Sequence, residues 1–218
     1  MITFNIITLF PQIIETHLEY LPFKRGIEKD LIKVNLVNLR DFAIDARGTV
    51  DEKPYGGGVG MILRIEPIYN ALKSLNVKKG ESSSKKIILM SPSGETYNQE
   101  KAILYNPLEE ITLICGRYEG VDARVLELVD ETVSIGNYVL SGGELPALVI
   151  MESIVRLRPG ILEKEGALAT ESFNPSIQSK LEYPQYTRPE DFNGLKVPEI
   201  LLSGNHAEIK KWQEKNLS

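Results

Sequence analysis

Three apolar segments of this sequence each end in a loop of small residues, and each is followed by a helical pattern. They are Lys85–Gly94 (KKIILMSPSG), Glu110–Gly120 (EITLICGRYEG) and Ser134–Gly160, whose glycine-rich loop leads into an apolar helix. Strands that alternate with helices form open parallel sheets, and ligands bind in such sheets beyond the carboxyl ends of the strands. The sequence therefore predicts an α/β fold with a binding site where the three loops converge.

Further strands and helices are expected around these segments. Ile2–Leu9 is a β-rich run that stops before Pro11, and Leu31–Leu39 alternates as a half-buried strand does. Helical spacing is found in Glu66–Leu75, Asn98–Tyr105, Val121–Val129 and Glu144–Leu157. A final helix is expected to start with Asn205 as its N-cap and Glu208 three positions on, as in a capping box.

Composition limits the class of protein. The 218 residues, 42% of them hydrophobic, are enough for one α/β domain and a small second one. No apolar run reaches about 18 residues, so no membrane span is expected. The N-terminal segment reads as a strand and not as a signal peptide, and Cys115 is the one cysteine, so we expect a cytoplasmic protein. A net charge of -5 argues against a general nucleic-acid binder but allows a local basic patch.

The segment from Arg40 to Arg64 is too long for a simple connection, which indicates a functional or a disordered loop. It contains GGGVG (Gly56–Gly60), which matches neither a P-loop nor the dinucleotide fingerprint. The pattern alone leaves a flexible turn and a phosphate- or base-binding loop equally open. The neighbouring Tyr55, Arg47 and Lys53 favour binding, because an aromatic ring can stack on a base and cations can pair with phosphates.

Other charged residues have ordinary interpretations when taken alone. Taken alone, Arg117 and Glu119 in GRYEG would be solvated residues of a turn. Because two similar loops occur in the chain, we expect this loop to belong to a binding site instead. Arg156 follows Glu152 by four residues on a helix, which favours an exposed ion pair. Glu171 lies in a small, polar segment and reads as a solvated carboxylate. The two histidines have no partners at ligand spacing, so they predict no metal site.

A set of motifs spread over nearly the whole chain resembles one enzyme family. In order they are ITLFP, RDF, VDEKPYGGGVGM, SPSG, CGRYEGVD, SIGNYVLSGGELPA, YTRP, VPEILLSGNHAEI and KKW. The chain is similar to the bacterial tRNA (guanine-N1)-methyltransferases, which modify the guanosine at position 37 of tRNA. The resemblance implies a SPOUT-like α/β fold, in which a parallel-sheet domain has a deep trefoil knot and a small helical C-terminal domain follows. It also implies a homodimer with each active site between two subunits.

The resemblance further divides the chain into three parts. Residues 1–162 would be the knotted catalytic domain that binds S-adenosylmethionine, 163–179 an interdomain linker, and 180–218 a C-terminal tRNA-binding domain. Family members typically continue beyond KKWQEKNLS, so this last domain is expected to be shortened.

Residues of the three loops match the positions that bind S-adenosylmethionine in the family. They are Ser91, Pro92, Gly116, Tyr118, Gly120, Ile135, Gly136, Asn137, Tyr138, Val139, Leu140, Gly142, Gly143 and Pro146. Glycines let the backbone approach a ligand closely, and apolar walls suit an adenine ring. Asn137 is a departure, because an aspartate is common at that position.

The resemblance also assigns catalytic and substrate residues. Arg156 matches an arginine that stabilises charge on the guanine, and Glu171 stands where the family has an aspartate as base. Glu119 resembles a residue implicated in magnesium dependence. The guanine pocket and its basic rim correspond to Tyr55, Gly56, Gly57, Gly58, Gly60, Arg47 and Lys53.

Two alternatives stay open at this point. One is a catalytically silent RNA-binding relative, which the glutamate at position 171 and the short C-terminal part would suit. The other is a knotted methyltransferase that acts on a ribose 2′-OH of another RNA.

Overall fold

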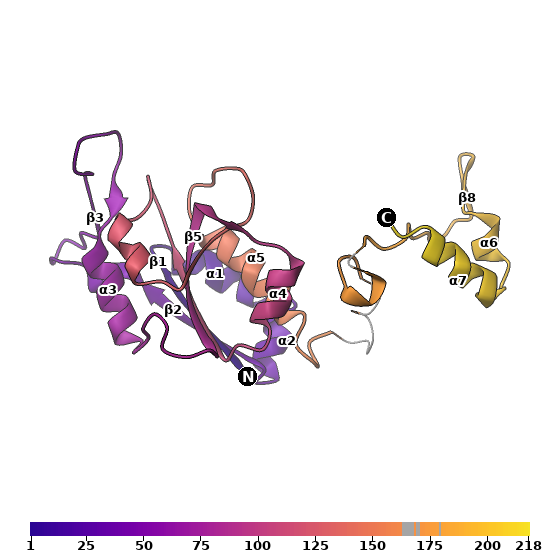
Figure 1. Cartoon of the computed structure of the whole chain (residues 1–218), viewed down its shortest axis with the longest axis horizontal. Helices are drawn as coiled ribbons and strands as arrows, with labels where there is room; N and C mark the ends of the chain where they lie inside the picture. The colour runs from indigo at the N-terminus through magenta and orange to yellow at the C-terminus, as the bar shows by residue number, and fades with distance from the viewer. Residues whose placement is uncertain (163–167, 169–170, 179) are drawn as a thin grey trace. The chain divides into compact units, whose positions relative to one another are not determined.

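The structure, a computed structural model, describes residues 1–162, 168, 171–178 and 180–218. It contains two compact units, residues 1–162 and 163–218 (Figure 1). The predicted linker at 163–179 includes all of the residues that are not described, so its boundaries stay a prediction. Among the described residues, no helix is long and apolar enough to cross a membrane.

A five-stranded parallel sheet forms the centre of the first unit. Its strands are β1 (Ile2–Thr8), β2 (Ile32–Asn38), β5 (Lys85–Thr96), β6 (Glu110–Cys115) and β7 (Glu131–Ser134), in the order β2-β1-β6-β5-β7. Every neighbouring pair in this sheet runs parallel. The predicted α/β class with a parallel sheet is therefore confirmed.

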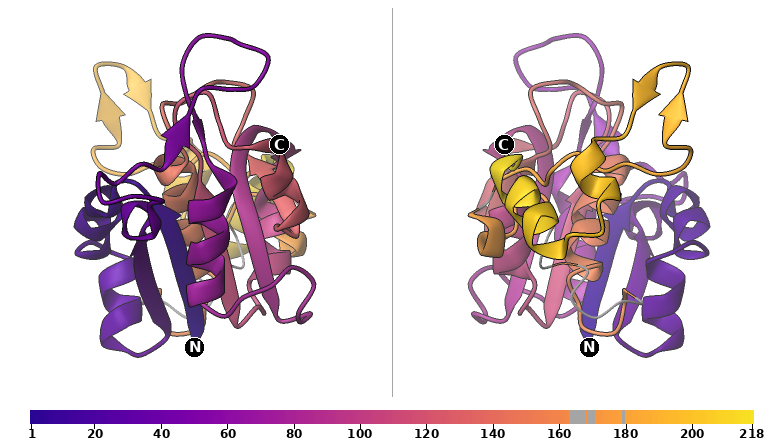
Figure 2. Two further views of the ribbon diagram at one scale, coloured as in Figure 1. Left: turned by 90° about the vertical axis from the view of Figure 1, so that its left-hand side faces the viewer. Right: turned by 90° about the vertical axis from the view of Figure 1, so that its right-hand side faces the viewer.

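Helices cover both faces of the sheet (Figures 1 and 2). The helices of this unit are α1 (Pro11–Leu18), α2 (Phe23–Glu28), α3 (Ile65–Ser74), α4 (Gln99–Tyr105) and α5 (Glu144–Val155). Residues of α1, α2, α4 and α5 share one buried cluster with Ile2, Phe4 and Ile6 of β1. Residues of α3 share the other cluster with Ile7. Because successive side chains of a strand point to opposite faces, β1 contributes to two cores.

The SPSG segment (Ser91–Gly94) differs from the expected strand-end loop. It lies inside β5, which pairs with β7 again at Glu95 and Thr96, beside Val133 and Ser134. The interruption appears as a register shift between Met90 and Glu95. Its cause is tertiary: Gly94 lies so close to β7 that an added Cβ would be 2.5 Å from the backbone of Thr132. The strand therefore continues past the loop, which bulges out at the sheet's end.

The helix expected over Val121–Val129 is a short 3-10 helix, Ala123–Glu127 (η2). Its start is fixed by Asp122, whose side chain accepts a hydrogen bond from the backbone N–H of Arg124. Its end is fixed by the sheet, because the N–H of Asp130 donates to the carbonyl of Ile87. Between these two anchors the segment forms one short 3-10 helix and not the expected α-helix.

The second unit, described by itself, combines short helices with a β-hairpin. Its elements are η4 (Pro175–Ile177), β8 (Asp191–Phe192), β9 (Leu195–Lys196), α6 (Glu199–Leu202) and α7 (His206–Lys215). Asn205 caps α7 by accepting from the N–H of Glu208 at 3.4 Å, so the predicted cap is confirmed. The rings of Tyr183 and Tyr186 lie 6.3 and 6.4 Å from that of Trp212.

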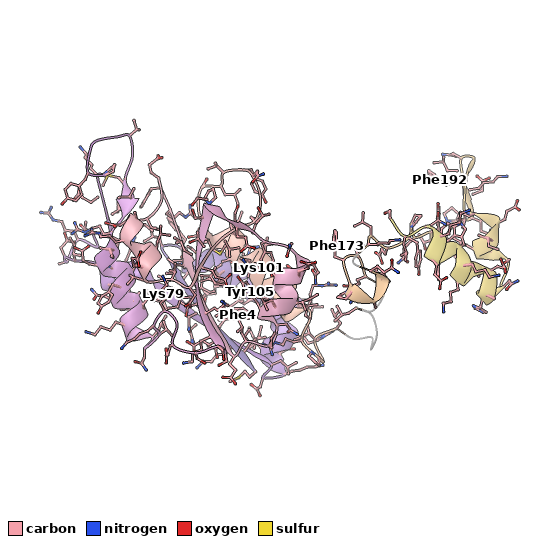
Figure 3. All side chains as sticks on the ribbon, in the orientation of Figure 1. Phe4, Lys79, Lys101, Tyr105, Phe173 and Phe192 are labelled. Atoms are coloured by element: carbon pink, nitrogen blue, oxygen red, sulfur yellow. The ribbon has the colours of Figure 1, made fainter. Side chains whose placement is uncertain are left out.

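A cluster of charged residues fixes α4 to the sheet. Lys101 and Tyr105 project from α4 (Figure 3) and both contact the carboxylate of Glu131, at the start of β7. Lys86 pairs with the same carboxylate from β5. Burial raises the pKa of Glu131, but hydrogen bonds from Lys86, Tyr105 and Lys101 outweigh this effect and hold its pKa below the usual value. The charged form of this carboxylate is therefore favoured more strongly in the folded protein than in the unfolded chain.

We predict that Glu131→Gln lowers the free energy of unfolding at pH 7 by about 1–3 kcal/mol, the usual value for hydrogen bonds to a charged group. Because the folded-state pKa is lowered, this contribution is present above about pH 4.5 and is lost as the pH falls through the folded-state value. Urea titrations of both proteins at pH 7 and pH 3 should therefore differ less at pH 3. The exposed Glu127→Gln serves as the control. An equal difference at both pH values would contradict this role.

Candidate functional site

Three segments enclose a cavity of about 230 Å³, at the bulge in β5 and at the carboxyl ends of β6 and β7. We call them the first loop (Ser91–Gly94), the second loop (Gly116–Gly120) and the third loop (Ile135–Gly143). The lining also includes Leu89, Met90, Val121, Val133, Ser134 and Pro146. The convergence expected from the strand ends is thus present in the fold.

The structure brings most of the predicted cofactor residues together. Those that line the cavity are Ser91, Pro92, Gly116, Tyr118, Gly120, Ile135, Gly136, Tyr138, Val139, Leu140, Gly142, Gly143 and Pro146. Asn137 is exposed and is not among the lining residues. The role of each of these residues in binding a cofactor stays a prediction.

The third loop packs tightly against the end of β6. The N–H of Gly143 donates to the carbonyl of Gly116 at 2.9 Å. A Cβ on Gly143 would lie 2.7 Å from Cα of Cys115 and 2.9 Å from Cβ of Met90. Only a residue without a side chain fits between these atoms, and this contact fixes where α5 begins.

An ion pair joins the second loop to the start of α5. Nε of Arg117 lies 3.0 Å from Oε2 of Glu144, which is 1% exposed, and Oγ1 of Thr8 donates to the same carboxylate at 2.7 Å. Burial, followed by the charge of Glu144, raises the pKa of the Cys115 thiol well above its usual value. Cys115 is therefore a protonated core residue and not a nucleophile.

The loop predicted to bind the target base lies outside the cavity. Tyr55 and Gly56–Gly60 connect β3 (Asp51–Glu52) and β4 (Ile62–Leu63), and the side chain of Tyr55 is fully exposed. This loop and the third loop project from the same end of the sheet (Figure 2).

Backbone contacts attach this loop to the second loop. The N–H of Glu119 donates to Met61 O at 3.0 Å, and the N–H of Leu63 donates to Gly120 O at 2.9 Å. A Cβ on Gly60 would lie 2.6 Å from the side chain of Glu119. Arg47 and Lys53, the predicted basic rim, are both exposed.

The two predicted catalytic residues do not line the cavity. Arg156 is the C-cap of α5, a helix whose first residue, Glu144, follows the third loop. Glu171 belongs to the second unit, where it is half-buried and its N–H donates to the carbonyl of Leu168. Their catalytic roles stay predictions.

Glu119, the predicted magnesium residue, contributes a single carboxylate to the cavity lining. Among the described residues, no three acidic, histidine or cysteine side chains gather as metal ligands. One carboxylate is too small a donor set for a resident ion, although Mg²⁺ can complete its shell with water and substrate oxygens.

A parallel sheet whose strand-end loops enclose a glycine-lined cavity defines an α/β ligand-binding protein. The sequence model of one family, described as tRNA (Guanine-1)-methyltransferase TrmD, matches residues 2–218. The chain therefore belongs to this family, which confirms the family predicted from its motifs and the predicted class of enzyme.

Individual proteins agree with this assignment. The tRNA (guanine-N(1)-)-methyltransferase of Dictyoglomus turgidum is 47% identical over 99% of this chain and 84% of its own length. That of Lactobacillus helveticus is 49% identical over 97% of this chain and 84% of its own length. The crystal structure of the tRNA (m1G37) methyltransferase from Aquifex aeolicus matches with a TM-score of 0.79 at 38% identity, over 98% of this chain and 88% of that one.

Arg117 lines the cavity, as expected for a loop that is one of three similar ones, but the sequence does not predict its partner. Its guanidinium pairs with Glu144, which is 27 positions further on. The available signal was the acidic residue directly after Gly142–Gly143, at the start of a helix that follows the glycine-rich loop.

We predict that Gly143→Ala lowers the free energy of unfolding by about 1–3 kcal/mol, the cost of overpacking. Gly143 has an ordinary φ of -83°, so the effect comes from the contact with Cys115 and not from backbone strain. Gly116→Ala is the matched control, because its Cβ would meet atoms no closer than 3.4 Å. Thermal and urea unfolding should separate the two variants, and equal stabilities would contradict the packing argument.

Proposed function

We propose that this chain transfers a methyl group from S-adenosylmethionine to N1 of the guanosine at position 37 of tRNA. The observation that carries the proposal is the cavity formed by the three loops, together with membership of the family. The name of the Aquifex aeolicus protein supports position 37 as the target. A tRNA substrate also agrees with a cytoplasmic location.

The cavity suits the proposed methyl donor. Ile135, Val139, Leu140 and Pro146 provide apolar surface for an adenine ring, and the glycines leave backbone N–H and carbonyl groups accessible. S-adenosylmethionine supplies a methyl group bound to a positively charged sulfur. The chain's own task is to bind this molecule in one conformation and to exclude water from it.

A deep trefoil knot is part of the proposal. The third loop enters α5 directly after Gly143, which lies against the backbone of β6, and β5 separates β6 from β7 in the sheet. The third loop thus crosses from β7 past the end of β5 to reach β6. Such a crossing, in direct backbone contact, is what a knotted arrangement of these loops requires.

Two side chains carry the chemistry on the guanine. N1 loses a proton as the methyl group arrives, and negative charge grows on O6. Glu171 accepts the proton as general base, and Arg156 stabilises the charge on O6. A glutamate has the same acid–base chemistry as the family's aspartate and reaches one methylene farther.

The position of Arg156 supports a homodimer with shared active sites. The cavity adjoins the first residue of α5, and Arg156 follows the last of its 12 residues. At about 1.5 Å per residue the helix is about 18 Å long, so one copy cannot place its own arginine at its own cavity. Leu145 and Val149, one turn apart on α5, are 52% and 47% exposed. Such an uncovered apolar stripe suits a surface for a second copy.

The tRNA is bound from outside the cavity. The ring of Tyr55 and the backbone of Gly56, Gly57, Gly58 and Gly60 receive the target base, which has to leave its stack to be reached. Arg47 and Lys53 contact phosphates, so a local basic rim compensates for the net negative charge. A magnesium ion would take Glu119 as its protein ligand and complete its shell from water and substrate.

The second unit adds a surface for RNA. Trp212 of α7 forms an aromatic cluster with Tyr183 and Tyr186, which precede that helix, and Lys215 lies in its last turn. We propose that this unit binds the tRNA.

A single-turnover assay tests the proposed reaction. With excess protein and S-adenosylmethionine, tRNA carrying guanosine at position 37 should gain one methyl group, recovered as N1-methylguanosine on nucleoside analysis. The same tRNA with adenosine at position 37 is the control and should gain none. A 2′-O-methylated nucleoside would favour the ribose methyltransferase, and no methylation would favour the silent relative.

Variants of the two catalytic residues test their roles. Arg156→Ala should lower turnover by about 10²–10³-fold, as expected for loss of one charge-stabilising group, while the Kd for S-adenosylmethionine stays within about threefold. Glu171→Gln should lower turnover by about 10²–10⁴-fold, because an amide cannot act as a base. Glu182→Gln, a half-buried carboxylate in the same unit, is the matched control. A large loss of cofactor affinity in Arg156→Ala would remove that residue from the catalytic role.

A further inference from the structure

A buried carboxylate lies directly behind the cavity wall. Glu144 is 1% exposed and Thr8 is fully buried, and neither residue lines the cavity. Oγ1 of Thr8 donates to Oε1 of Glu144 at 2.7 Å, and Nε of Arg117 donates to both carboxylate oxygens at 3.0 and 3.2 Å. Glu144 is therefore held from two sides, by the end of β1 and by the second loop.

Arg117 connects this carboxylate to the wall itself. Its side chain lines the cavity and is 18% exposed. Nη1 donates to the carbonyl of Ser141 in the third loop at 3.3 Å, and the guanidinium carbon lies 4.5 Å from the ring centre of Phe10. One guanidinium thus contacts the third loop, the start of α5 and Phe10, the N-cap of α1.

The backbone near Arg117 leaves room for its ion pair with Glu144. A Cβ on Gly142 would lie 2.2 Å from Nε of Arg117 and 2.5 Å from Oε2 of Glu144. Tyr118, which follows Arg117, has a φ of 60°, a left-handed conformation that costs energy for a residue with a side chain. Such strain persists only where the surroundings fix the loop, and the pair with Glu144 is the strongest such contact of Arg117.

We propose that Glu144, oriented by Thr8, is a positioning residue that holds Arg117 and so fixes the second and third loops in their ligand-binding arrangement before the ligand arrives. The proposal rests on the proposed function, because it takes S-adenosylmethionine as the ligand. Preorganised loops bind more tightly, since the entropy of ordering them has already been lost on folding. The pair acts on binding, whereas the chemistry on the guanine belongs to other residues.

Thr8 offers the sharpest test because its hydroxyl donates to Glu144 from outside the cavity. The same oxygen also accepts from the N–H of Phe10 at 3.0 Å, the residue whose ring contacts Arg117. Thr8→Val keeps the shape of the side chain but removes the hydroxyl, and Thr8→Ser restores it. The matched control is Thr112→Val: Thr112 is 1% exposed on the adjacent strand β6, where its hydroxyl accepts from Asn5 and does not line the cavity. Both valine variants remove a buried hydroxyl from the same sheet, and Thr8→Val in addition removes the acceptor of the Phe10 N–H.

We expect Thr8→Val to raise the Kd and KM for S-adenosylmethionine by about three- to tenfold, the value of one buried hydrogen bond. At saturating methyl donor and tRNA, kcat should stay within about twofold of the wild type, since the chemistry on the guanine is unchanged. Thr8→Ser should restore the wild-type Kd, and Thr112→Val should leave it unchanged. A Kd that Thr8→Val leaves unchanged, or that Thr112→Val raises to the same extent, would overturn the proposal.

A second test measures amide hydrogen exchange of Glu144→Gln in the absence of ligand. Amides of the second and third loops should exchange at least about tenfold faster than in the wild type, while those of the central strands keep their protection. Unchanged loop exchange would overturn the proposal. If Glu144→Gln does not fold, the same exchange measurement on Thr8→Val and Thr112→Val decides. Wild-type protein that fails to bind S-adenosylmethionine would refute the proposed function, but the exchange comparison would still test whether the pair orders the loops.

Discussion

The contact between Gly143 and the end of β6 is the constraint on which the rest of the first unit depends. It joins the N–H of Gly143 to the carbonyl of Gly116 and leaves no room for a Cβ beside Cys115. Because α5 begins at the next residue, this contact sets the position of a helix whose residues fill the larger core. Gly116 and Gly143 also line the cavity, so the packing that positions α5 also shapes the binding site.

Much of the fold follows from local patterns. The apolar runs of β1, β2 and β6 lie in the observed sheet because β-rich sequences bounded by turns have few other stable arrangements. The exceptions come from tertiary contacts. The SPSG segment has the composition of a terminal loop, but pairing of Glu95 with Val133 extends β5 beyond it. The segment at Ala123–Glu127 has helical spacing, but it forms a short 3-10 helix between Asp122 and Asp130, whose N–H groups donate to Leu63 and Ile87.

The candidate site also has one part that the sequence predicts and one part that only the fold reveals. Glycines in strand-end loops are visible in the sequence, and these loops do enclose the cavity. The role of Arg117 is not visible, because it depends on Glu144 and on Thr8, which is 136 positions from Glu144 along the chain. Spacing along the chain carries no information about such a pair. Motifs identify the loops through their residue types, whereas the side chains that support the loops can be identified only from the fold.

The adjacent glycines of the third loop, Gly142 and Gly143, pack against different neighbours. This difference limits how the sequence can evolve at each position. Gly142 makes room for the side chains of Arg117 and Glu144, whereas Gly143 makes room for the backbone of β6. Side chains can be exchanged for shorter ones, so Gly142 is free to change in concert with its two neighbours. A backbone has no shorter form, and no second substitution can compensate for a change at Gly143. Variation at the first position should therefore be correlated with its partners, and the second should be invariant.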